Sequence, residues 1–166
     1  MTISTLKDLY IDQLQDLYSA NRQALKVTRE LKEAAGSDQL RSALEAGANG
    51  IEEGMDQLKQ MIENHDANPR GEHCRGMEGL VAEARAHGIE ADFSDADVRD
   101  ASIIAQYQRM THYAISGYGT VHAFAARLGL EEDAGVLKQC LEDTRGGDLK
   151  MTAIASGEVN PAAAEA

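Results

Sequence analysis

The sequence predicts an all-α protein: a four-helix bundle with one long crossover that carries a short extra helix. Apolar residues recur at helical spacing over four long stretches of the chain. Only 2 of the 166 residues are proline, and Pro69 and Pro161 lie outside those stretches, so neither interrupts a helix. The chain has few aromatic residues and no Trp, so Leu, Ile, Met and Ala must supply most of the bundle core.

The first two predicted helices form a hairpin. Thr5 followed by Asp8 is typical of an N-terminal cap for the first helix, and Gly36 of its C-terminal stop. Ser37 or Asp38 then caps the second helix at once. Because this joint is so short, the two helices must fold back on each other in antiparallel directions. We expect them to span residues 4–35 and 38–64.

A long connection separates this hairpin from a second one. The helical pattern breaks up over residues 65–93, where one short helix at about 77–86 is expected. Ser94 with Asp97 caps a third long helix, and Gly129 stops it before the fourth. Two hairpins joined by one long crossover is the connectivity of ferritin-like bundles. The long helices are expected at 95–128 and 132–156, the domain at 1–157 and a flexible tail at 158–166.

The charge of the chain argues against anionic partners. Its formal net charge is −12, and no basic stripe offsets the acidic residues. Phosphate binding needs such a stripe, so we expect no nucleic-acid partner. An anionic membrane surface is disfavoured for the same reason. No stretch approaches the roughly 20 apolar residues that a membrane span needs.

The cysteines and the first residues favour a cytoplasmic protein. Cys74 and Cys140 are far apart and lack the spacing of a metal site, so two free thiols are expected. The first residues, 1–5, have neither the basic nor the apolar region of a secretory signal peptide. We therefore expect no such signal.

Each apolar stripe is interrupted near its midpoint by small or polar residues. Because the midpoints of similar antiparallel helices meet at one level, we expect these residues to converge in a polar layer. Buried polar groups must find partners, and a lone acid such as Asp148 needs a cation, a donor or a raised pKa. The predicted layer contains Asn21, Asn49, Gly50, Glu52, Thr111, His112, Thr144, Gly147 and Asp148.

The residues alone leave two alternatives for this level. The polar layer either fixes the register of the helices through its own hydrogen bonds, or it binds a metal or a small molecule. Glycines crowd the same level, at a cost of roughly 1 kcal/mol each relative to Ala. Either the helices approach closely there, or missing side chains leave room for a cavity and a bound molecule. The glycines within the predicted helices, several of which lie near this level, are Gly47, Gly50, Gly54, Gly117, Gly119, Gly146 and Gly147.

Several short motifs resemble one family. The chain is similar over nearly its whole length to the YciE/YciF family of ferritin-like bacterial proteins. This resemblance implies the ferritin-like fold, a homodimer and a link to stress responses, whereas the activity of the family is poorly defined. The matching stretches are residues 16–20 (DLYSA), 74–80 (CRGMEGL), 112–113 (HY), 118–120 (YGT) and 148–152 (DLKMT).

The resemblance also implies a di-iron site that this chain has largely lost. Relatives carry a Glu on helix one, a Glu-x-x-His pair on helix two and acids on the last two helices. Two metal ions need several anionic ligands, so a standard di-iron centre is not expected here. Of the matching positions, two acids remain, Glu52 and Asp148, which are the candidate metal ligands. Neutral residues occupy the others: Asn21, Asn49, Thr111, Ala114 and Thr144.

Three hypotheses about function follow. The first is a stress-associated, dimeric bundle with a degenerate di-metal site, no catalytic residues and no resident cofactor. The second is a metalloprotein that uses iron or manganese as an oxidase or peroxide-handling enzyme, with Glu52 and Asp148 helped by Asn21, Asn49 or His112. The third is a protein that binds a small molecule in the core of the bundle.

Overall fold

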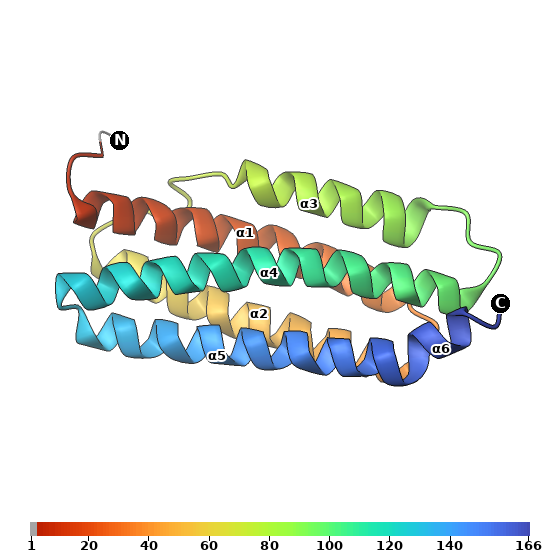
Figure 1. Cartoon of the computed structure of the whole chain (residues 1–166). Coiled ribbons are helices and arrows are strands. Elements are labelled where there is room, and N and C mark those ends of the chain that lie inside the picture. The colour runs from red at the N-terminus through yellow and green to blue at the C-terminus, as the bar shows by residue number, and fades with distance from the viewer. Residues whose placement is uncertain (1–2) are drawn as a thin grey trace.

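Four long helices pack side by side, and a shorter one lies outside them (Figure 1). A computed structural model describes residues 3–166. Residues 1 and 2, which the sequence prediction included in the domain and in the segment without a signal peptide, lie outside the described residues. The described chain contains no strand, which confirms the predicted all-α class. The helices are α1 (Leu6–Ala34), α2 (Asp38–Asn64), α3 (Arg75–Arg85), α4 (Ala96–Leu128), α5 (Glu131–Ile154) and α6 (Asn160–Ala163). Two π-helical turns follow α3 and α5, at Ala86–Glu90 and Ala155–Val159.

The helices are arranged as two hairpins, α1–α2 and α4–α5, joined by the long crossover that carries α3. α3 packs on α1 and α4, whereas α2 meets α5 on the other side of the bundle. This connectivity is the one predicted from the lengths of the loops. None of the described helices is long and apolar enough to cross a membrane.

The predicted helix starts are confirmed with one small shift. Thr5 and Asp8 form a reciprocal capping box at the start of α1. Ser37 caps α2 by accepting from the amide of Leu40 at 3.2 Å. At α4 the cap is Asp95 rather than the predicted Ser94, because the Asp95 carboxylate accepts from two amides of the first turn.

The α1–α2 joint is held by a residue far away in sequence. Gly36 was expected to stop α1, but the C-cap is Ala35, in an extended conformation, and the φ of Gly36 is not positive. Instead, the amides of Gly36 and Ser37 donate to the two oxygens of Asp100, at 2.8 and 2.7 Å. Asp100 belongs to α4 and is completely buried. A buried carboxylate thus joins the first hairpin to the second.

Gly129 ends α4 as predicted. Its φ of 73° is the left-handed conformation that Gly adopts without strain. The amide of Leu130 reaches back to the carbonyl of Ala125 at 3.0 Å, which completes the turn into α5.

The C-terminal region differs from the predicted flexible tail at 158–166. The chain remains helical to Ala163, and Val159 is buried beside the last residues of α5. The π-helical turn supplies the change of direction, and Pro161 lies in the first turn of α6, where its missing amide proton is no loss. Glu158 also accepts from the Ser37 hydroxyl at 2.6 Å.

The apolar core is divided into two clusters, one toward each end of the bundle. One cluster includes Leu31, Leu40 and Met77, and the other includes Leu14, Leu58 and Leu137. The level between them is the level at which the sequence predicts polar and small residues. The candidate site therefore lies where the apolar core is interrupted.

Candidate functional site

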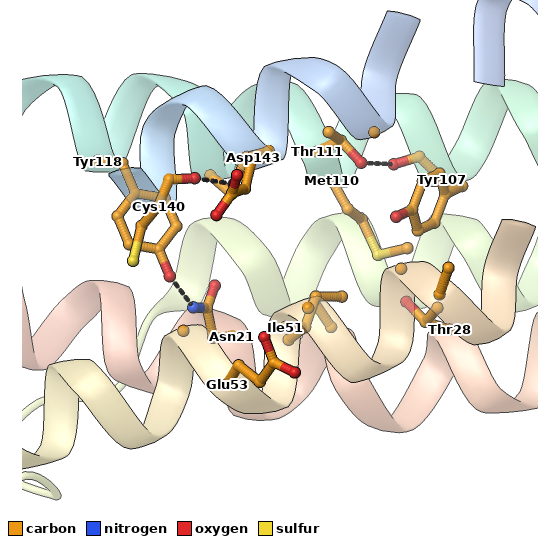
Figure 2. Close-up of a pocket in the computed structure, with 18 of the residues that line it drawn as sticks. Asn21, Thr28, Ile51, Glu53, Tyr107, Met110, Thr111, Tyr118, Cys140 and Asp143 are labelled. Atoms are coloured by element: carbon orange, nitrogen blue, oxygen red, sulfur yellow. Dashed lines mark hydrogen bonds between the residues drawn. The ribbon is translucent and has the colours of Figure 1, made fainter. Parts of the chain in front are cut away.

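A cavity of about 540 Å³ lies at the middle level of the bundle, between α1, α2, α4 and α5. Its walls on α1 and α4 are mostly buried, whereas most of the polar residues on α2 and α5 are exposed, so the cavity opens between α2 and α5. Figure 2 shows the side chains of opposite helices pointing toward one another across this space. Of the predicted polar layer, the structure brings Asn21, Thr111 and Thr144 together here.

Seven of the positions that line the cavity follow a regular spacing. Each of three helices contributes a pair separated by three residues, and α1 contributes Asn21. Glu-x-x-His pairs at this spacing hold the metals of ferritin-like bundles, together with single acids from the other helices. The pairs here are Gly50 with Glu53 on α2, Thr111 with Ala114 on α4, and Thr144 with Gly147 on α5.

The predicted contribution of α2 is wrong by one residue. Asn49 and Glu52 do not line the cavity, and both are exposed. Glu52 pairs with Arg29 on the surface, with 3.0 Å between Oε2 and Nη2. One residue along a helix turns the side chain by about 100°, so shifting from Gly50 to Asn49 moves it off the inner face.

Asp148 also lies apart from the cavity. Its side chain is 16% exposed and packs between α5 and α4. One carboxylate oxygen accepts from the Gln108 amide at 3.0 Å, and the other lies 2.9 Å from Nε2 of the exposed His112. The sequence required a cation or a donor for this acid, and the structure provides donors. Glu52 and Asp148 therefore do not converge as two ligands of one site.

The glycines were expected either to allow close approach of helices or to leave room for a cavity, and the structure shows both, at different positions. A Cβ on Gly47 would lie 2.2 Å from the hydroxyl oxygen of Tyr107, and one on Gly54 would lie 2.5 Å from that of Tyr118. These two glycines allow tyrosines of α4 to rest on α2. Gly50, between them, has no neighbour within 4 Å of its Cβ position and faces the cavity, as does Gly147. Close contact and open space therefore alternate along one face of α2.

The two tyrosines bound the cavity at its ends (Figure 2). Tyr118 is 3% exposed, and its oxygen accepts from the Asn21 amide at 2.7 Å. Burial raises the pKa of Tyr118 and of Tyr107, so both remain neutral phenols at ordinary pH. Thr111 uses its hydroxyl within α4, donating to the Tyr107 carbonyl at 3.0 Å.

These buried phenols predict a loss of stability in alkaline solution. Burial raises the pKa of Tyr118 above its ordinary value of 10.0, and burial with the hydrogen bond to Asp133 raises that of Tyr10. The unfolded chain releases these protons near its ordinary pKa while the folded chain retains them. The free energy of unfolding therefore falls as pH rises above about 10, by about 1.4 kcal/mol per pH unit for each such tyrosine.

Urea unfolding at several alkaline pH values checks this dependence. Tyr118→Phe removes one of the phenols, so its free energy of unfolding should fall less steeply with pH. The slope of the variant should be smaller than that of the unaltered protein by about 1.4 kcal/mol per pH unit. Equal slopes for the variant and the unaltered protein would contradict the prediction for Tyr118.

No group of three or more His, Cys, Asp or Glu residues within residues 3–166 is arranged to hold a metal ion. Glu53 is the single acid among these seven cavity-lining positions, and it lies exposed at the mouth. Asp143 on α5 is the other acid that lines the cavity, and it is exposed as well. Asn and Thr offer only neutral oxygens, which are poor substitutes for the carboxylates that a di-metal site needs.

A second cluster, which the sequence did not predict, lies beside the start of α3. The Cys74 thiol is 2.9 Å from the Tyr113 hydroxyl, which donates to Asp16 at 3.1 Å. The Ser19 hydroxyl accepts from the Cys74 amide at 3.0 Å. Burial raises the pKa of Cys74, so its thiol is a packing and capping group rather than a nucleophile. All four residues lie in the family motifs at 16–20, 74–80 and 112–113. The joint occurrence of these motifs was the one sequence signal that could have predicted this cluster.

Sequence comparison places the chain in a family. The model of the family DUF892, described as a domain of unknown function, matches residues 5–164. The chain belongs to the DUF892 family. Protein YciF of Escherichia coli (strain K12) is 33% identical to this DUF892 protein over 161 residues, which are 96% of each chain. The resemblance read from the motifs is thereby confirmed.

Two solved structures share the fold of this DUF892 protein. The crystal structure of the E. coli stress protein YciF matches with a TM-score of 0.87 and 31% identity, over 95% of this chain and 99% of that one. YcfI from Rhodopseudomonas palustris matches with a TM-score of 0.85 and 29% identity, over 92% and 96% of the two chains. The arrangement of the helices is therefore shared with both of these proteins.

Proposed function

We propose that this DUF892 protein is a stress-associated, non-catalytic bundle with a degenerate di-metal site. One observation carries the proposal: seven of the residues that line the cavity have the spacing of a ferritin-like metal site, and only Glu53 among these seven is acidic. Two adjacent divalent ions repel each other unless several carboxylates offset their charge. Glycine, alanine, threonine and asparagine at the remaining positions leave too few such ligands.

Three further parts of the proposal rest on relatives and on composition. The stress association is supported by 33% identity to YciF, which is named as a stress protein in its crystal structure. Homodimer formation follows from the family resemblance, and a measured mass in solution tests it. A cytoplasmic location is supported by two free cysteines, one of them buried.

Elemental analysis of protein purified without chelator tests the degenerate site. We expect iron, manganese and zinc well below one equivalent per chain, because one exposed acid does not form a site. The same low content is expected for Glu53→Ala, Glu52→Ala and Asp148→Ala. One equivalent or more of a metal in the native protein, lost in any of these variants, would favour the alternative metalloprotein and overturn the proposal.

A variant with restored carboxylates provides the matched positive control. Asn21→Glu, Gly50→Glu, Thr111→Glu and Thr144→Glu together return an acid to each of the four helices at the cavity. We expect this variant to take up added divalent metal and to gain thermal stability with it, because a ligand that binds only the folded state stabilises it. If the restored variant binds no metal, this level is not the remnant of a metal site.

A further inference from the structure

We propose that the cavity binds an uncharged, mostly apolar small molecule that carries one hydrogen-bonding group, such as a hydroxylated aromatic ring. This binding role goes beyond the degenerate metal site. Metal content and small-molecule binding are measured separately, so either can fail without the other.

The first support is the shape of the cavity. Its volume of about 540 Å³ lies within the range of roughly 300–1,000 Å³ that is usual for small-molecule sites. Tyr107 and Tyr118 close it at the two ends, and an apolar core cluster lies beyond each of them.

The second support is the chemistry of the walls. The charged residues are confined to the exposed mouth, where Glu53 and Asp143 outnumber Lys150. An anion would therefore meet repulsion at the mouth and no compensating cation inside, whereas a neutral ring would replace water on apolar walls. Those apolar walls are formed by Ala24, Ala43, Ile51, Met110, Ala114, Val136 and Met151.

The third support is a set of polar groups with bonding capacity left over. The Asn21 amide donates to the Tyr118 oxygen at 2.7 Å, which leaves the phenolic proton of Tyr118 and the carbonyl of Asn21 for a ligand. Toward the other end, beside Tyr107, the fully buried Thr28 has a hydroxyl with no partner in the described structure. A buried polar group without a partner is unusual and favours an occupant with a polar group of its own.

Three naphthalenes of similar size separate these contributions in titration calorimetry. 2-Naphthol has a hydroxyl, naphthalene lacks it, and 2-naphthoate is an anion at neutral pH. We expect 2-naphthol to bind about tenfold more tightly than naphthalene, which corresponds to one net hydrogen bond, and at least about tenfold more tightly than 2-naphthoate. Absence of 2-naphthol binding, or equal affinity for the anion, would overturn the proposal.

A matched pair of glycine variants tests the location. Gly50 and Gly146 are both exposed helical glycines with nothing within 4 Å of a Cβ, but only Gly50 lines the cavity. Gly50→Leu should fill part of the cavity and weaken 2-naphthol binding at least about tenfold, whereas Gly146→Leu should bind like the native protein. Circular dichroism melting confirms that both variants fold. Unchanged binding by folded Gly50→Leu would place the ligand elsewhere.

Cys140 provides a second test of location without any change of sequence. Its side chain lines the cavity and is partly exposed, whereas Cys74 is 1% exposed and lies outside the cavity. With saturating 2-naphthol, the reaction of Cys140 with N-ethylmaleimide, followed by mass spectrometry, should slow at least about fivefold. Cys74 should remain unmodified throughout. An unchanged rate at Cys140 would contradict binding in this cavity.

Discussion

Asp100→Ala is expected to lower the free energy of unfolding by about 3 kcal/mol, because it leaves two backbone amides without acceptors. The carboxylate of this fully buried residue accepts from Gly36 at 2.8 Å and from Ser37 at 2.7 Å. Hydrogen bonds to an ionised acceptor are among the strong ones in proteins, and these two lie at the positive N-terminal end of α2. Their loss weakens the link between the turn that joins α1 to α2 and helix α4.

Urea unfolding of three variants measures this effect. Asp100→Asn retains one carbonyl oxygen and presents an amide donor to the second backbone amide, so it should lose almost as much stability as the alanine variant. Asp92→Ala changes an exposed acid in the preceding loop and should stay within about 0.5 kcal/mol of the native value. Equal stability of Asp100→Ala and Asp92→Ala would contradict the structural role of Asp100.

Gly47→Ala and Gly54→Ala are each expected to destabilise the fold by up to about 2 kcal/mol, although alanine favours helices. The added Cβ atoms would lie 2.2 and 2.5 Å from the hydroxyl oxygens of Tyr107 and Tyr118, so the rings must move. Overpacking of this kind costs about 1–3 kcal/mol, which exceeds the gain of about 1 kcal/mol in helix propensity. At Gly54 the displaced ring also strains the hydrogen bond from Asn21.

The neighbouring glycine is the matched control. Gly50 lies on the same face of the same helix, with no atom within 4 Å of its Cβ position. Gly50→Ala should therefore raise the free energy of unfolding by about 0.4–1 kcal/mol, because it removes freedom from the unfolded chain at no steric cost. If all three substitutions stabilise the protein equally, the tyrosines do not rest on these glycines.

On the proposed function, the degenerate metal site and the cavity have one physical origin. Small residues occupy positions where a metal-binding bundle carries long acidic side chains. The helices cannot close the resulting space, because Tyr107 and Tyr118 hold α4 away from α2 on either side of it. Loss of ligands thus leaves volume rather than a tighter core.

Most of the fold could be predicted because its signals are local. Caps at Thr5 and Ser37, the left-handed Gly129 and the apolar spacing all act within one or two turns of the chain. The C-terminal region was the exception. Residues after 157 look weakly apolar in sequence, and only the packing of Val159 into the core shows why the helix continues.

The candidate site could be predicted only in part. Asn21, Thr111 and Thr144 meet where expected because they interrupt their stripes at the middle of each helix. The α2 pair was misassigned because the family resemblance placed it on Asn49 and Glu52, one residue before Gly50 and Glu53. Glycine carries no sequence signal for which way it faces, and its neighbours across the bundle decide that question.

The sequence by itself determined the class of the fold, the order of its helices and the level at which the core is interrupted, because periodicity and capping are properties of each helix alone. The tertiary structure alone decided the rotation of α2, the separation of Glu52 from Asp148 and the existence of the cavity. These depend on contacts between helices, where a single residue of register turns a side chain by about 100° and moves it from the core to the solvent.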